Sequence, residues 1–227
     1  GYYAVNTTSS TRLNTSLDDL ASSTTIVTKE MMSDFAMLDI NDMFAYEAGT
    51  EGSGTFTDAA VDRNGSPIDT TSTNPNVANR VRGIGNANLA IGNFASNGFV
   101  PVDPINIDGV EINRGPNSSI FGLGEVSGTV NLQPSTANVL RNRTSIGVRA
   151  DSYGGHRESL DLNRVLVPGK LAIRGSAVYQ HEGFVRRPAG VDSVRLNAMV
   201  RIQPFKTTSL TASYSKYRSY GTMDNKT

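Results

Sequence analysis

The sequence predicts an α+β domain over residues 1–138, followed by antiparallel β-strands over residues 139–227. Two short helical patterns beside a β-branched segment indicate the first part. Five long segments with apolar–polar alternation, the first beginning near Arg143, indicate the second. The connectors between these segments contain glycine or proline, so we expect tight turns and antiparallel neighbours.

Composition narrows the possible classes of protein. Lys and Arg number 21, Asp and Glu number 21, and the resulting net charge of zero argues against a nucleic-acid partner. The chain has no cysteine, which excludes disulfides, thiolate metal sites and cysteine nucleophiles. No apolar run approaches the roughly 20 residues of a membrane-spanning helix, which excludes a helical membrane protein. The chain opens without Met and without a signal-peptide pattern, so we expect a mature or excised segment.

The first regular elements are expected near residue 24. Thr24–Thr28 (TTIVT) is β-branched throughout and predicts a short strand. A helix is expected from about Lys29, with one face formed by Met31, Phe35 and Leu38. A second helix is expected after Asp39, whose carboxylate can cap it, and Gly49 is expected at its C′ position. The buried face of this second helix is predicted to carry Ile40, Met43 and Phe44.

The middle of the chain mixes loops with short strands. Residues 50–79 and 84–100 are rich in turn-forming residues and are expected to be loops. Asn79–Gly83 restores a strand pattern, and Thr129–Gln133 predicts a further strand. Alternation on both sides of Gly109 predicts a strand, a turn at that glycine and a second strand.

The alternating segments after Arg143 admit two architectures. One face of each carries Leu, Ile, Val and Ala, and the other carries Arg, Asn, Asp and Ser. A soluble antiparallel sheet would bury the apolar face against a second layer, whereas a transmembrane barrel would turn it towards lipid. The barrel is favoured, because the segments exceed the usual strand length of about 5–6 residues and no predicted element covers the apolar face. Aromatic residues towards the strand ends fit the girdles of such barrels: Tyr179, Phe205, Tyr214, Tyr217 and Tyr220.

The stretch Val110–Leu132 resembles a phosphate-binding loop at first, because it contains Gly122, Gly124 and Gly128. The spacing is Gly-x-Gly-x-x-x-Gly, one residue longer than the dinucleotide fingerprint. The following TVNLQP predicts a strand, so no helix N-terminus is available to hold a pyrophosphate. We therefore expect these glycines to allow positive φ and close backbone approach in a tight strand-to-strand crossing.

Three elements in order resemble the TonB-dependent outer-membrane receptors. TTIVTKE resembles the strand-to-helix entry of their plug domain, and Val81–Gly83 resembles its (I/V)RG strand. VEINRGP, FGLG and GTVN, all within residues 110–131, resemble the motif that closes the plug, although Thr129 replaces the second glycine of the usual pair. The resemblance implies a plug over 1–138 and about five strands of an incomplete transmembrane β-barrel over 139–227, out of about 22 strands in a closed barrel of this class.

The resemblance also implies roles for individual residues. It assigns a plug latch that gates the barrel to Arg82, Gly83, Arg114, Gly115 and Pro116, and it assigns the role of plug hinges to Gly122, Gly124 and Gly128. In such receptors the latch arginines face the barrel wall and pair with its carboxylates. We expect these partners on barrel strands outside this sequence, with Glu158 and Glu182 as the candidates within it. Apical plug loops contact ligand in this family, which makes a candidate ligand-contact loop of Asn86, Asn88, Asn93, Phe94, Asn97 and Phe99.

The expected function is gated uptake of a scarce ligand across the bacterial outer membrane, with the plug facing the periplasm and barrel lumen. The ligand classes that the resemblance implies are siderophores, cobalamin and oligosaccharides. Expected partners are this ligand, outer-membrane lipid, and TonB through a segment upstream of Gly1, with no nucleic acid. We expect no enzyme activity, cofactor or metal site, because His156 and His181 are isolated and no catalytic motif occurs. The alternative is a soluble β-rich extracellular binding or adhesion module.

Overall fold

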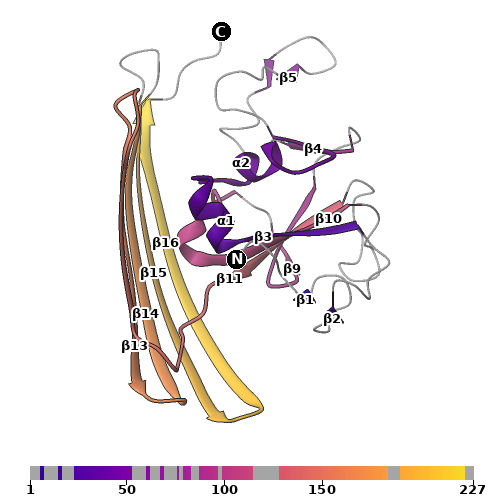
Figure 1. The fold of residues 1–227 in the computed structure, drawn as a ribbon. Coiled ribbons are helices and arrows are strands. Elements are labelled where there is room, and N and C mark those ends of the chain that lie inside the picture. The colour runs from indigo at the N-terminus through magenta and orange to yellow at the C-terminus, as the bar shows by residue number, and fades with distance from the viewer. Residues whose placement is uncertain are drawn as a thin grey trace. The chain divides into compact units, whose positions relative to one another are not determined.

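The computed structural model of the chain describes residues 6–7, 15–16, 23–52, 60–61, 67–68, 76, 79–82, 87–96, 99–114, 128–183 and 190–222. Contacts within the chain define two units, unit 1 within Gly1–Pro134 and unit 2 within Ser135–Asn225. Figure 1 colours unit 1 from indigo to magenta and unit 2 from salmon to yellow. None of the helices in these residues is long and apolar enough to cross a membrane.

Unit 1 is built on a mixed five-stranded sheet with the strand order β3-β10-β11-β8-β9. Its strands are β3 (Ser23–Thr28), β8 (Asn88–Ile91), β9 (Phe94–Ala95), β10 (Ile107–Arg114) and β11 (Gly128–Pro134). β10 pairs antiparallel with β3 and β11, and β11 pairs parallel with β8. Three two-stranded pairs accompany it: β1 (Asn6–Thr7) with β2 (Thr15–Ser16), β4 (Thr50–Gly52) with β7 (Asn79–Val81), and β5 (Ala60–Val61) with β6 (Pro67–Ile68).

One face of the sheet forms the core of unit 1 together with two helices, α1 (Lys29–Asp34) and α2 (Ile40–Ala45). Asp39 caps α2 as predicted, since its Oδ1 accepts the Asp42 N–H at 2.8 Å. Burial raises the pKa of the Asp39 carboxyl, and the charge of Asp42 raises it further. The core includes Val27, Met32, Met37, Ile40, Met43, Phe44, Val110, Ile112, Val130 and Leu132. The predicted buried face of the second helix is therefore confirmed.

Both helices are shorter than the sequence pattern indicated. α1 ends at Asp34, and Ala36 adopts a positive φ of 53°. Phe35 is consequently exposed. Met32 and Met37 are buried, whereas the sequence pattern predicted a face formed by Met31, Phe35 and Leu38. α2 ends at Ala45, so Gly49 lies beyond its cap, in the turn before β4, although its φ of 73° is positive as expected.

Two predictions for the sheet were wrong. β10 is one continuous strand, because Gly109 pairs with Gln133 on one side and Thr28 on the other, and only a bulge interrupts its register. Residues 84–100 contain β8 and β9, which the pattern assigned to a loop. The two strands form a hairpin through Gly92 and Asn93, whose φ values of 56° and 69° suit a two-residue hairpin turn.

Unit 2 is an antiparallel meander in the order β12-β13-β14-β15-β16. The strands are β12 (Arg143–Ala150), β13 (His156–Val167), β14 (Leu171–Gly183), β15 (Gly190–Phe205) and β16 (Thr208–Thr222). Figure 1 shows β13 to β16 as a curved sheet of long neighbouring strands. The five predicted alternating strands are confirmed.

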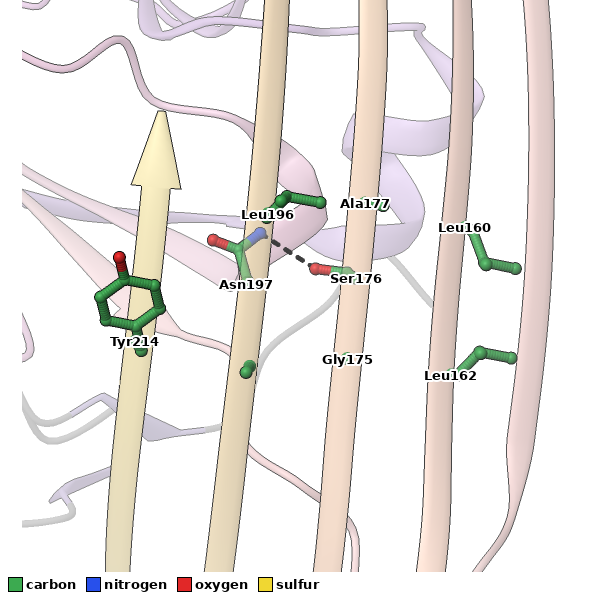
Figure 2. Close-up of a pocket in the computed structure, with 9 residues that line it drawn as sticks. Leu160, Leu162, Gly175, Ser176, Ala177, Leu196, Asn197 and Tyr214 are labelled. Carbon is green, nitrogen blue, oxygen red and sulfur yellow. Dashed lines mark hydrogen bonds between the residues drawn. The ribbon is translucent and has the colours of Figure 1, made fainter. Parts of the chain in front are cut away.

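The two faces of unit 2 have the reverse of the usual burial. Exposed side chains include Ile146, Val148, Leu160, Ile173, Leu196, Ile202, Leu210 and Tyr214. Buried side chains on the other face include Asp161, Asn163, Arg174, Ser176, Arg195 and Asn197. A depression of about 230 Å³ on the apolar face lies over small residues, including Gly175, Ala177 and Ala198, between larger ones such as Leu160 and Leu196 (Figure 2).

Two tyrosines depart from the predicted aromatic girdle. Tyr214 pairs with Ala198 in mid-strand and lines the depression. Tyr217 pairs with Arg195 on the polar face, and the Arg195 guanidinium lies 4.6 Å from its ring centroid. Tyr214 and Tyr217 are three residues apart, and an odd spacing along a strand places two side chains on opposite faces of the sheet. The predicted girdle grouped them only by their position along the strand.

Candidate functional site

The loop Glu47–Gly49, which joins α2 to β4, is the point where the two predicted latch arginines meet. Arg114 is the last residue of β10, and its side chain reaches this loop from the sheet. Arg82 follows β7, which pairs with β4, and its backbone N–H donates to the Gly49 carbonyl at 2.8 Å. The structure therefore brings together two residues that lie 32 positions apart. We call this arrangement the 47–49 loop site.

Arg114 makes three hydrogen bonds at this site. Nη1 donates to Glu47 Oε1 and, at 3.1 Å, to the Ala48 carbonyl, and Nη2 donates to Thr25 Oγ1 at 2.8 Å. The Thr25 hydroxyl in turn donates to Glu47 Oε1 at 2.9 Å. The Arg114 and Glu47 side chains are only 14% and 13% exposed, so solvent screens their attraction weakly. The arginine therefore ties the 47–49 loop to both β10 and β3.

The partner that the structure shows for Arg114 is Glu47 of unit 1. The pairing with barrel carboxylates that the resemblance implied stays a prediction. The sequence pattern places Glu47 within the second helix, whereas it lies in the loop after α2. Arg82 has a positive φ of 54° and an exposed side chain, so its backbone forms the contact with the loop.

Gly128 is the one predicted hinge glycine among the described residues. It lies opposite Arg114 in the β10–β11 pair and has a φ of 140°. A Cβ atom there would lie 2.2 Å from the Asn113 carbonyl oxygen, so only glycine fits this crossing. The other predicted latch and hinge residues lie outside the described residues: Gly83, Gly115, Pro116, Gly122 and Gly124.

The predicted ligand-contact residues that the structure describes do not gather in one loop. Asn88 begins β8 and pairs with Thr129, next to the Gly128 end of β11. Asn93 and Phe94 follow the other end of β8, where the Gly92 N–H donates to the Leu132 carbonyl. Phe94 is 79% exposed there, and Phe99 is 66% exposed in the segment before β10. Asn86 and Asn97 lie outside the described residues.

A buried polar network supports the turn that carries Phe94. Glu111 is fully buried, and its carboxylate accepts hydrogen bonds from Asn131 Nδ2 at 3.1 Å and from Gln133 Nε2. The Asn131 amide also holds Asn93, accepting its backbone N–H and donating to its Oδ1, both at 2.9 Å. These three hydrogen bonds of the Asn131 side chain fix the turn that carries Phe94 to the centre of the sheet.

A second polar network begins at Asn76. The sequence did not reveal it, because the pattern assigns this segment to a loop. Asn76 is buried, donates to the Val100 carbonyl at 2.8 Å and accepts the Val102 N–H at 3.1 Å. Asn79 donates to the Asn76 carbonyl at 2.8 Å. These bonds fix the segment that carries exposed Phe99. Asparagine-rich stretches often form turns, so composition offered no signal for this role.

Within the part of the chain that the structure describes, no group of three or more His, Asp or Glu side chains is placed to hold a metal ion. The absence of a metal site, a cofactor and enzyme activity stays a prediction.

A family model described as the TonB-dependent receptor plug domain matches residues 16–129, half of the chain. The chain belongs to this family. The residues that match its plug lie in unit 1, and the 47–49 loop site lies among them. The family consists of outer-membrane receptors, which places this protein in the outer membrane.

Three solved receptors illustrate the fold. The ferripyoverdine receptor of the outer membrane of Pseudomonas aeruginosa is 21% identical, with a TM-score of 0.77 over 96% of this chain and 28% of that chain. The alcaligin outer-membrane receptor from Bordetella pertussis is 19% identical, with a TM-score of 0.76 over 96% and 36%. The ferric-catecholate import receptor from E. coli K12, in its open form, is 18% identical, with a TM-score of 0.72 over 92% and 29%. This plug and its antiparallel barrel strands thus span 28% to 36% of those receptors.

Proposed function

We propose that this protein takes up a ferric siderophore across the outer membrane, with TonB as the energy-coupling partner. The chain contributes the plug and the first barrel strands. The plug family supports the receptor class. Three receptors of similar structure are named for ferripyoverdine, alcaligin and ferric catecholate, which supports a siderophore over the other expected ligands, cobalamin and oligosaccharides.

The observation that carries the proposal is the reversed burial of unit 2 directly after a plug. Leu160, Leu196 and Tyr214 are exposed on one face, while Asp161 and Arg174 are buried on the other. Strands in an outer-membrane barrel carry apolar residues towards lipid and polar residues towards the lumen. A soluble binding or adhesion module would need to bury the apolar face, which is exposed in the described strands.

The 47–49 loop site is the proposed latch of the plug. Arg114 holds the loop through one charge-assisted bond to Glu47 and two further bonds, and such an interaction is strong, oriented and breakable. Release of this loop would free the β4–β7 pair, to which Arg82 is attached. We propose Gly128 as a hinge of the same movement, together with the neighbouring latch and hinge residues Gly83, Gly115, Pro116, Gly122 and Gly124.

The ligand contacts are proposed for the aromatic and amide residues of the plug. The exposed ring of Phe99, on the segment that Asn76 fixes, offers a flat apolar surface. Phe94 and Asn93 lie at the opposite end of β8 from Asn88, so the proposed contacts are spread over both ends of this strand. Asn86 and Asn97 complete the proposed set.

Uptake in a defined host tests the function. The receptor gene that encodes this chain is expressed in cells that lack their own siderophore receptors, with and without TonB. Radioiron-loaded ferripyoverdine, ferric alcaligin and a ferric catecholate are supplied separately, beside labelled cobalamin and a labelled oligosaccharide. We expect TonB-dependent accumulation of a ferric siderophore. Correct membrane insertion without TonB-dependent uptake of any probe would overturn the proposal.

The latch is tested with Arg114→Ala and Arg114→Lys in the same cells. The lysine variant keeps the positive charge and loses the guanidinium fork. Both are expected to lose gated uptake and to keep most of their ligand binding. Glu47→Gln should weaken the same site from the other partner. Unchanged uptake in all three variants would remove the latch role and leave the uptake function intact.

A further inference from the structure

The segment Ser135–Asn142, which we call the strap, links the plug to β12. It has no regular secondary structure, and alternate residues in its first part are buried: Ser135, Ala137 and Val139. Ala137 and Val139 form a small apolar cluster with Ala172 of β14. A connecting segment in solvent would satisfy its backbone groups with water. Here, strand residues of unit 2 bind them instead.

Asn163 of β13 binds the strap through its side-chain amide. Oδ1 accepts the Asn138 N–H at 2.8 Å, and Nδ2 donates to the carbonyls of Asn138 at 2.8 Å and Arg141 at 2.7 Å. The amide thus bonds both backbone groups of one residue, as a neighbouring β-strand would. The Asn163 side chain is itself buried. A backbone hydrogen bond also holds the strap, because the Gly169 N–H donates to the Val139 carbonyl at 2.9 Å.

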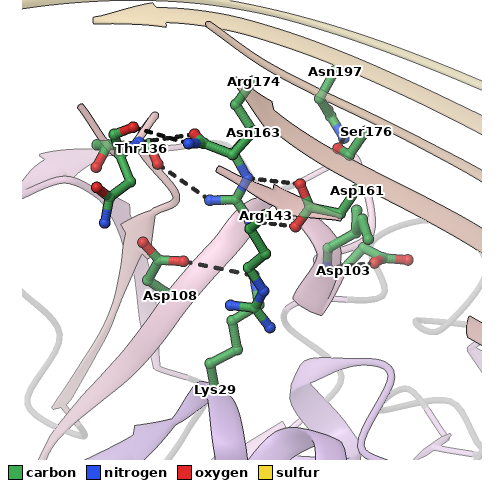
Figure 3. A network of polar contacts seen from close by, with 12 residues as sticks. Lys29, Asp103, Asp108, Thr136, Arg143, Asp161, Asn163, Arg174, Ser176 and Asn197 are labelled. Atoms are coloured by element: carbon green, nitrogen blue, oxygen red, sulfur yellow. Dashed lines mark hydrogen bonds and ion pairs between the residues drawn. The ribbon is translucent and has the colours of Figure 1, made fainter. Parts of the chain in front are cut away.

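A buried ion pair lies beside Asn163 on the same face (Figure 3). Arg174 lies directly opposite Asn163 in the β13–β14 pair. Its Nε and Nη2 donate to the two oxygens of Asp161 at 2.8 and 2.6 Å, and its Nη1 donates to the Thr136 carbonyl at 3.2 Å. The side chains are 9% and 8% exposed. The carboxylate orients the guanidinium so that its remaining nitrogen reaches the strap.

We propose that Asp161, Asn163 and Arg174 form an anchor that stops force-driven unfolding of the plug at Ser135. Tension applied from the N-terminal side can extract plug strands one after another. It then meets a segment held by five side-chain hydrogen bonds to four strap residues, from Thr136 to Asn142. Asn142 supplies one of these bonds, since its Oδ1 accepts the Val165 N–H. The anchor keeps the first barrel strand in register while the plug is displaced.

The anchor rests on the proposed function only in that TonB would supply the tension. Single-molecule force measurements need neither TonB nor ligand, so they separate the two. The intact receptor is held in a membrane and pulled from the N-terminal side of the plug. In the wild type, the last plug rupture is expected at the contour length that ends at Ser135.

Two variants weaken the anchor without leaving a lone buried charge: Asn163→Ala, and the double variant Asp161→Asn with Arg174→Gln. In Asn163→Ala, which removes three of the five bonds, the last rupture should move to Arg143 and release the strap, which adds roughly 26–29 Å at 3.3–3.6 Å per extended residue. The double variant removes only the bond to Thr136 and should move the last rupture to Asn138, which adds roughly 10–11 Å. Asn197→Ala is the matched control, because Asn197 is buried on the same face and bonds Ser176. Equal lengths in the anchor variants and the control, or a wild-type rupture already at Arg143, would overturn the proposal.

Amide exchange gives a second readout for variants that insert poorly. The Asn138 N–H, whose acceptor is Asn163, should exchange at least tenfold faster in Asn163→Ala and at the wild-type rate in Asn197→Ala. Equal exchange in the two variants would show that Asn163 does not hold the strap.

Discussion

Replacing Arg114 with alanine is expected to loosen the 47–49 loop without unfolding the rest of the plug. The substitution removes the bond to the Glu47 carboxylate, which is worth about 1.5–3 kcal/mol, and two bonds from the same guanidinium to uncharged acceptors, taken at about 1 kcal/mol each. Water can enter the vacated space and offset part of this loss. We therefore expect the free energy of opening the loop to fall by about 3 kcal/mol.

Glu47→Ala removes fewer contacts, because the bonds from Arg114 to Thr25 and the Ala48 carbonyl can persist. The expected loss is about 2 kcal/mol. Because both substitutions delete the same ion pair, the double variant should lose about 1.5–3 kcal/mol less than the sum of the single variants.

Amide exchange of the Arg82 N–H measures this opening, since that group donates to the Gly49 carbonyl in the same loop. A loss of about 3 kcal/mol corresponds to exchange roughly 100-fold faster, at about 1.4 kcal/mol per factor of ten. Amides of β13 and β14 serve as internal controls. Losses that add within about 0.5 kcal/mol would refute the coupling of Arg114 to Glu47.

Three further predictions concern other parts of the chain. Gly128→Ala should destabilise the plug by about 2 kcal/mol or more in urea unfolding. Gly175→Ala is the control and should cost little stability, because its Cβ would meet only an oxygen at 3.9 Å. Equal effects of the two substitutions would contradict the strained crossing at Gly128. The folded state raises the pKa of Asp39 above 3.8, so its proton stabilises the plug below the unfolded value, and this contribution is lost as the pH rises through the folded value. Asp39→Asn keeps a capping acceptor and should therefore gain stability relative to wild type as the pH rises, and a pH-independent difference would contradict the shift. Ala198→Arg places a charge at the depression on the apolar face and should cost about 2–4 kcal/mol in vesicles, while Gln203→Arg on the polar face should change stability by less than about 0.5 kcal/mol; similar costs would argue against a lipid-facing surface.

The strands of unit 2 could be predicted because the residue pattern within each strand reflects the surroundings of its two faces. A strand with one apolar and one polar face alternates at every residue, so the pattern repeats many times over β13, β14 and β15. The plug motif was equally readable, since its arginines and glycines occur at fixed positions. The pattern did not show which face of the sheet is covered. The burial of Asp161 and Arg174 on the polar face became visible only in the three-dimensional structure.

The partners of the latch and the strap could not be predicted for a different reason. Glu47 meets Arg114 across 67 positions, and Asn163 meets Asn138 across 25. Such contacts depend on how the elements pack and leave no periodic signal. β8 was missed because it is only four residues long and follows a glycine- and asparagine-rich segment. The Gly92–Asn93 pair between apolar residues was the available hairpin signal.

The two ion pairs differ in a way that orders their release under tension. Arg114 donates one bond to the Glu47 carboxylate, whereas Arg174 donates two parallel bonds to Asp161 and is more deeply buried. A bidentate pair must lose both bonds before water can enter, and deeper burial weakens the competition from solvent. Under the proposed function, the 47–49 loop therefore detaches first and the strap last. That order allows a plug to move within a receptor while the chain that connects it to the barrel stays in place.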